Sequence, residues 1–249
     1  MAMRIAILSD IHANLAALEN VLNEIDARQP DAVWCLGDIV GYGPHPQACA
    51  DIIRERAAVC LAGNHDLAVL GKIDLADFNP IAREAALWQR DRLNAESLQW
   101  LAGLPTRTEA EGITLAHGSP RHPVWEYVNN KDVAAENYDA FATSVCLVGH
   151  SHLAAGWRMR RQNRGIAVEW VTERPGVPIT LELSEKWLLN PGSVGQPRDR
   201  DPRASFALLD TETWQWVWHR VAYDIGAAER DIIAAGLPEA LGRRLYLGW

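Results

Sequence analysis

The first sixty residues alternate between short apolar runs and segments of helical spacing. The runs at 3–9, 32–36 and 58–62 are apolar enough to form buried strands. Between them, residues 14–28 carry apolar side chains three and four positions apart, and residues 46–56 form a second helical segment. Strand, helix, strand, helix, strand predicts parallel strands joined by right-handed crossovers.

The rest of the chain has a different pattern. Residues 66–102 have mostly helical spacing. Beyond Pro105 the pattern becomes mostly that of strands, and two short helices are expected at the C-terminal end. No repeat or low-complexity segment divides the chain, so residues 1–249 are expected to form one domain. The expected later strands are 112–117, 144–149, 154–161, 165–172, 178–183, 186–190, 204–210 and 214–222.

Charge and composition exclude some classes of function. The 24 Lys and Arg residues are outnumbered by 32 Asp and Glu, which gives a formal net charge of −8. Broad binding to DNA or to an anionic membrane needs a basic surface, so we expect neither a nucleic-acid nor a membrane partner. The first residues lack signal-peptide character and no segment has the roughly eighteen apolar residues of a membrane span, which favours a cytoplasmic protein. The four cysteines have no paired spacing, which favours reduced thiols.

Five apolar runs end in side chains that can bind a metal ion. They are RIAILSDIH, AVWCLGD, AVCLAGNH, ITLAH and SVCLVGHSH. Because the carboxyl ends of strands in an open sheet share one edge, these side chains are expected to converge. Each motif alone is a common turn or cap, but five of the eight histidines fall in these positions. The candidate ligands are Asp10, His12, Asp38, Asn64, His117, His150 and His152.

The types of ligand indicate what they bind. Asp, His and Asn suit Mn, Fe, Zn or Ni, and the absence of Cys argues against a structural zinc knuckle. Seven ligands are too many for one tetrahedral ion, so we expect two divalent ions bridged by Asp38, the lone carboxylate of its loop. Two such ions lower the pKa of a shared water, so that a hydroxide nucleophile forms near neutral pH.

The ordered motifs DIH, GDIVGYG, GNHD, HGSP and GHSH resemble those of the calcineurin-like metallophosphoesterase superfamily, and the NPGSVGQPRDRDPRASFALLD segment extends the likeness to residue 210. The resemblance implies an α/β fold with four layers, α/β/β/α. It also implies one ion held by Asp10, His12, Asp38 and His152, and another held by Asp38, Asn64, His117 and His150.

The same resemblance gives His65 the role of protonating the leaving oxygen, with Asp66 to orient it. A loop histidine with satisfied hydrogen bonds is the alternative. Serine/threonine protein phosphatases and similar bacterial diadenosine tetraphosphatases carry Arg where this chain has Tyr42, and the protein phosphatases usually also carry Arg where it has Ala62. Neither residue replaces a planar bidentate donor. The chain is therefore more similar to the small bacterial phosphodiesterases.

Contacts to the substrate are assigned from two segments. The one after His117 offers a cation with Trp125 and Tyr127 as stacking surfaces, or else a turn with aromatic core residues. The one after residue 190 offers polar groups for the pocket rim, or else a solvated charged loop. The expected substrate contacts are Arg121, Asn190, Ser193 and Arg198.

Three functions are compatible with this sequence. The first is a dinuclear-metal phosphodiesterase or phosphatase that hydrolyses a small soluble phosphoester. The second is a diadenosine-polyphosphate hydrolase, which would prefer dinucleotides to simple esters. The third is a non-catalytic scaffold, as in a retromer subunit that resembles this fold, but the intact ligand set and His65 disfavour it. Metal identity and oligomeric state stay open at this point.

Overall fold

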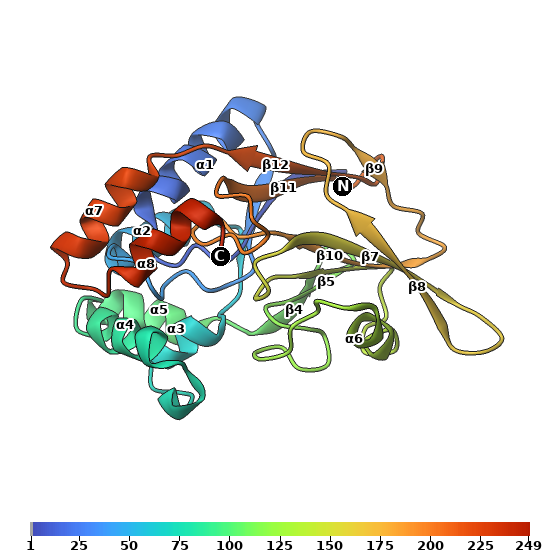
Figure 1. The fold of residues 1–249 in the computed structure, drawn as a ribbon. Coiled ribbons are helices and arrows are strands. Elements are labelled where there is room, and N and C mark those ends of the chain that lie inside the picture. The colour runs from blue at the N-terminus through green and yellow to red at the C-terminus, as the bar shows by residue number, and fades with distance from the viewer. Residues whose placement is uncertain (1) are drawn as a thin grey trace.

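Two six-stranded mixed sheets form the centre of the computed structural model, which describes residues 2–249 (Figure 1). The first sheet has the order β3 (Val59–Cys60), β2 (Ala32–Cys35), β1 (Arg4–Leu8), β11 (Ala204–Asp210), β12 (Gln215–Val221) and β9 (Ile179–Thr180). The second has the order β4 (Arg107–Ala110), β5 (Ile113–Ala116), β6 (Val145–Val148), β10 (Lys186–Pro191), β7 (Ala154–Arg161) and β8 (Ile166–Thr172).

The helices cover the outer faces of these sheets (Figure 1). Most of them pack on the first sheet, while α6 packs on the second. The helices are α1 (Leu15–Arg28), α2 (Pro46–Arg56), α3 (Asn64–Val69), α4 (Pro80–Arg90), α5 (Ala95–Gly103), α6 (Lys131–Glu136), α7 (Ile225–Ala234) and α8 (Ala240–Arg243), with two 3-10 turns at η1 (Leu75–Asp77) and η2 (Arg244–Leu247).

Three hydrophobic clusters define the layers. In β1 the side chains alternate, so that Ile5 and Ile7 pack between the two sheets, while Ala6 and Leu8 face the helices. A third cluster lies between the second sheet and α6. This order of helix, sheet, sheet and helix confirms the expected four-layer α/β/β/α architecture.

The parallel crossovers predicted for the first third of the chain are confirmed. β1 pairs in parallel with β2, and β2 with β3, with α1 and α2 as the connections. The side chain of Asn14 accepts a hydrogen bond from the Ala17 amide at 3.2 Å and so begins α1. Pro46 occupies the first turn of α2, where its missing N–H is not needed.

Several elements differ from the sequence expectations. The expected helical stretch 66–102 is divided into α3, η1, α4 and α5, because Asn79 and Asn94 each cap a new helix. Both β4 and α6 were missed, since each is short and neither has a clear apolar period. The expected strand 178–183 is reduced to the two residues of β9. Within residues 2–249, no helix is long and apolar enough to cross a membrane.

Candidate metal centre

The seven candidate ligands lie together beyond the carboxyl ends of strands. Asp10 and His12 follow β1, and Asp38 follows β2, all in the first sheet. His117 follows β5, and the pair at 150 and 152 follows β6, in the second sheet. The expectation of one shared sheet edge was therefore wrong: the ligands converge because two sheets packed face to face bring their edges together.

The ligand atoms form two groups that share one carboxylate. In each group, the atoms that can bind an ion lie within 4.8 Å of one another, and all the side chains are buried. Asn64 adjoins the second group, with its Oδ1 at 3.2 Å from His117 Nε2. The assignment of individual ligands to two ions stays a prediction. The groups are Asp10, His12, Asp38 and His152, and Asp38, His117 and His150.

Facing lone pairs show that the first group suits a cation. The Nδ1 atoms of His12 and His152 lie 3.1 Å and 2.6 Å from backbone carbonyl oxygens, so both must donate. Burial lowers the pKa of both imidazoles, which therefore stay neutral. Their Nε2 atoms then carry lone pairs that face each other at 3.0 Å. A cation between them turns this repulsion into attraction.

An unpartnered oxygen marks the point that the two groups share. Asp38 Oδ2 is buried and has no hydrogen-bond partner among the described residues. It lies 3.7 Å from His12 Nε2 and 3.4 Å from His117 Nε2. A buried carboxylate oxygen without a hydrogen bond is costly in a folded chain; here the charged His117 imidazole compensates it in part, and a divalent ion on each side would satisfy it. The donor set therefore fits the divalent metals implied by its chemistry.

The charges of the ion-free chain are balanced by protons. Burial raises the pKa of Asp10 to about 7, so that this acid is partly protonated at neutral pH. Burial opposes a charge on His117, but the Asp38 carboxylate outweighs it and raises the pKa of this imidazole to about 9. In turn, His117 and His65 overcome the burial of Asp38 and hold its pKa below the usual range. Binding of a divalent cation would displace these protons.

His65 faces the same cleft and has a free nitrogen. It is 4% exposed, and its Nδ1 has no hydrogen-bond partner among the described residues. The rings of Tyr42 and Phe78 lie 4.4 Å and 4.9 Å from the His65 ring and fix its plane. Gly41 is needed beside it, because a Cβ at this glycine would lie 2.4 Å from His65 Nδ1.

The expected role of Asp66 is corrected by its contacts. Its Oδ1 accepts from the amides of Ile39 and Val40 at 3.0 Å and 3.1 Å, and its Oδ2 accepts from the Gly63 amide at 2.8 Å. Within the described chain, no hydrogen bond joins it to the imidazole of His65. Asp66 therefore fixes the loop after β2 and the start of α3, and does not orient His65.

Of the four expected substrate contacts, Arg198 lines the cleft. Asn190 is buried and donates to the Gly149 carbonyl at 2.7 Å, while Ser193 is buried and donates to the Asp10 carbonyl at 2.7 Å. Both hold ligand loops in place instead of facing a substrate. The guanidinium of Arg121 is engaged by the carboxylates of Glu126 and Glu136, away from the cleft lining. The sequence showed these polar residues but not their bonding partners.

The cleft includes residues that the motifs did not indicate. Phe78 and Asn79 come from the connection between α3 and α4, which carries no motif. Arg198 enters from the loop after β10, with its Nη2 3.4 Å from the Tyr42 hydroxyl and 2.8 Å from Gln196 Oε1. Its buried Nε has no partner among the described residues. The cleft lining further contains Asp38, Asn64, His65, His150, His152, Asp77, Ala82, Trp125 and Tyr127.

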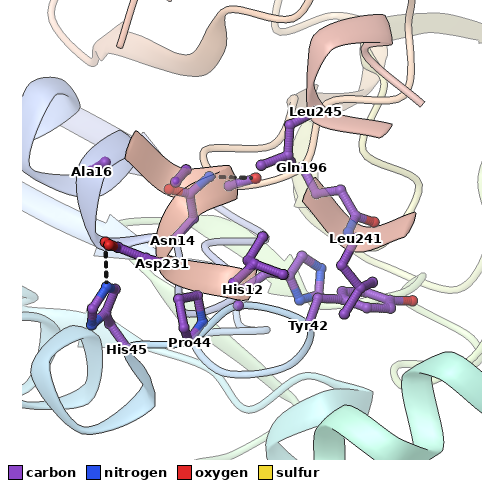
Figure 2. A pocket seen from close by; sticks show the side chains of 14 residues that line it. His12, Asn14, Ala16, Tyr42, Pro44, His45, Gln196, Asp231, Leu241 and Leu245 are labelled. Carbon is purple, nitrogen blue, oxygen red and sulfur yellow. Dashed lines mark hydrogen bonds and ion pairs between the residues drawn. The ribbon is translucent and has the colours of Figure 1, made fainter. Parts of the chain in front are cut away.

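A second cleft lies behind the wall formed by His12 and Tyr42 (Figure 2). There the C-terminal helices α7 and α8 contribute mostly apolar side chains, among them Leu241. His45 Nε2 and Asp231 Oδ2, which line this cleft, are 2.9 Å apart, and a dashed line joins the two side chains in Figure 2. Among the described residues that line this cleft, His12 is the one that belongs to a group of candidate metal ligands.

Comparison with known proteins agrees with this geometry. The family model for the calcineurin-like phosphoesterase superfamily domain matches residues 3–214. A crystal structure of a metallophosphoesterase from Sphaerobacter thermophilus is 44% identical, covers 100% of both chains and has a TM-score of 0.87. An uncharacterized protein of Methanocaldococcus jannaschii is 38% identical over an alignment that covers 98% of each chain.

A further structure shows that the fold extends beyond recognisable sequence similarity. A hypothetical protein from Pyrococcus horikoshii OT3 is 21% identical, covers 99% of this chain and 98% of its own, and has a TM-score of 0.78. The family match spans all five motifs, and the described structure brings their side chains together. The chain therefore belongs to the calcineurin-like phosphoesterase superfamily.

Proposed function

We propose that this chain is a metal-dependent phosphoesterase that holds two divalent ions and hydrolyses a small phosphoester. The observation that carries the proposal is the unpartnered Oδ2 of Asp38, buried between two groups of ligand atoms. In the ion-free chain the His117 imidazole, at 3.4 Å, balances the charge of this oxygen, and the neutral imidazole of His12 on its other side has a lone pair suited to a metal ion.

The ligands would divide between the two ions. Asp10, His12 and His152 would hold one ion, Asn64, His117 and His150 the other, and Asp38 both. Carbonyl oxygens that accept from the distal ring nitrogens fix the orientation of these histidines. When bound, two divalent ions lower the pKa of water and neutralise the charge that develops on the phosphoryl oxygens.

His65, which lines the cleft, would donate a proton to the leaving oxygen. Burial lowers the pKa of His65 to about 4, so the imidazole is neutral before the substrate binds. A bound phosphoester places an anion near this ring and raises its pKa, because a nearby opposite charge favours the protonated form.

Arg198 would hold a non-bridging oxygen of the phosphoester. It is the one Lys or Arg among the residues that line the cleft in the described chain. Its Nε has no partner there, while its Nη2 is directed by Gln196 and Tyr42. This geometry supplies a cation in the neighbourhood of Tyr42, the position at which the protein phosphatases carry their own arginine.

The experiment is hydrolysis of bis-p-nitrophenyl phosphate and of p-nitrophenyl phosphate, with Mn²⁺ or with chelator, together with measurement of metal content. For the wild type we expect hydrolysis that chelator abolishes, and about two ions per chain. Asp38→Asn should lose both ions and activity. Asp139→Asn is the matched control, since Asp139 is 76% exposed and pairs with Arg161 far from the cleft lining.

Two outcomes would contradict the proposal. Hydrolysis that persists at full rate in chelator would exclude metal dependence. Folded Asp38→Asn protein with the metal content and activity of the wild type would remove the shared carboxylate from the mechanism. The ratio of diester to monoester turnover, measured in the same assay, assigns the chain to phosphodiesterases or to phosphatases.

A further inference from the structure

Two exposed aromatic rings stand at the mouth of the metal cleft. Trp125 is 39% exposed and Tyr127 is 43% exposed, although both line the same cleft as the ligands. Large aromatic side chains usually bury most of their surface, and exposed apolar surface beside a charged site commonly marks a ligand contact. These rings therefore need an explanation other than core packing.

The Trp125 ring is held in a fixed position although 39% of the residue is exposed. Phe78, which is buried, meets it edge to face with ring centroids 5.4 Å apart. The Trp125 carbonyl accepts a hydrogen bond from His150 Nε2 at 3.2 Å, so its backbone is anchored to a candidate ligand. A ring that is already ordered loses little entropy on binding a partner, which favours recognition.

The open ring lies next to the reacting centre. Its centroid is 6.5 Å from that of the His150 ring, and Tyr127 stacks on the same imidazole at 4.0 Å. Arg198 and Tyr42 also line this cleft. The cleft thus combines a cation for a phosphate with an exposed aromatic ring for the organic part of an ester. A single ester with a phosphate at one end and a flat ring at the other would contact both the cation and the aromatic ring.

We propose that Trp125 stacks on a nucleobase, with Tyr127 beside it in the cleft lining, so that the substrates are phosphoesters of nucleosides. The inference rests on the proposed function, since the phosphate must lie at the metal centre. Stacking on an aromatic side chain tolerates any base, because every base has a π face. The proposal therefore names the class of substrate and not a particular base.

The test uses two non-hydrolysable ligands that differ only in the base: the phosphonate analogues of AMP and of ribose 5-phosphate, with CH₂ in place of the ester oxygen. Their dissociation constants are measured by titration calorimetry on the Mn²⁺-loaded protein. We expect the analogue with adenine to bind at least about fivefold more tightly, the lower end of the range for one stacked base. This ratio should fall to about one in Trp125→Leu and return in Trp125→Phe, which restores an aromatic face.

Trp170→Leu is the matched control. Trp170 is also exposed, at 43%, but it lies on β8 and packs against Trp157, outside the cleft lining. The ratio of the two dissociation constants measured for Trp170→Leu should equal that of the wild type. Equal affinity of the wild type for both analogues, or a ratio that Trp125→Leu leaves unchanged, would overturn the inference. The proposed function is tested apart from this inference: it stands if the wild type still hydrolyses bis-p-nitrophenyl phosphate or p-nitrophenyl phosphate, and it fails if neither ester is hydrolysed.

Discussion

Glu126 offers a stability prediction whose size follows from its contacts. Its carboxylate accepts from Ser119 Oγ at 2.7 Å, from Asn137 Nδ2 at 2.7 Å and from Arg121 Nη2 at 2.6 Å. Burial alone would raise the pKa of Glu126, but these donors outweigh it and lower the pKa to about 2, from 4.5 in an unfolded chain. The folded state therefore favours the ionised form.

The linkage between protonation and folding gives the pH window. A carboxyl whose pKa is lower in the folded state adds stability above the unfolded pKa, and this stability is lost as the pH falls through the folded pKa. The full difference corresponds to about 3 kcal/mol at pH 7, and about 2 kcal/mol of it is lost between pH 7 and pH 3. Because the Glu126 side chain is 15% exposed, solvent screening makes both of these free energies somewhat smaller.

The assay is urea unfolding of wild type and Glu126→Gln, followed by tryptophan fluorescence at pH 7, 5, 4 and 3. The wild type should be the more stable protein at pH 7, and the difference in free energy of unfolding should narrow as the pH falls from 5 to 3. Glu136→Gln is the control, because Glu136 also pairs with Arg121 but is 56% exposed, and we expect a small difference. A Glu126→Gln difference that is the same at every pH would refute the reasoning.

Three further changes test other parts of the molecule. Arg220→Met should lower the free energy of unfolding in urea by about 3 to 5 kcal/mol, because Arg220 is 1% exposed and its loss leaves two carboxylates unpaired. Gly63→Ala should lower metal affinity by about tenfold or more, since the new Cβ would lie 2.1 Å from Asp38 Oδ1; Gly103→Ala, with open space around it, should bind metal like the wild type. Gln29→Gly should raise the free energy of unfolding by about 1 kcal/mol, because the exposed C-cap of α1 has a φ of 50° that favours glycine.

The layers of the fold could be predicted because they depend on apolar spacing. The helix at Pro46–Arg56 and the strands at Ala154–Arg161 and Ala204–Asp210 have the bounds that their patterns predicted. The short elements could not be predicted in this way. α6 depends on the side chain of Asn130, which accepts from two amides at its start, and such caps are common in loops that form no helix.

Within the candidate site, residue types and order indicated the ligands, but not the groups around them. Arg121 and Arg198 are both arginines in polar loops, and the sequence alone gives no reason to assign them different roles. The structure separates them, because Glu126 and Glu136 occupy one guanidinium while the Nε of the other is unpartnered among the described residues. Tertiary contacts of this kind leave no local signal in the sequence.

Backbone strain gives an indication of function that is independent of the motifs. Of eleven non-glycine residues with positive φ in the described chain, seven lie in the loops around the metal cleft. Each costs about 1 kcal/mol relative to glycine, a large sum beside the net stability of a domain. A chain that needed only to fold would carry glycine there, but glycine offers no ligand atom. Five of these seven positions carry Asp or His although the backbone favours glycine, which is explained if their side chains are required. They are Asp10, His12, Asp38, His150 and His152.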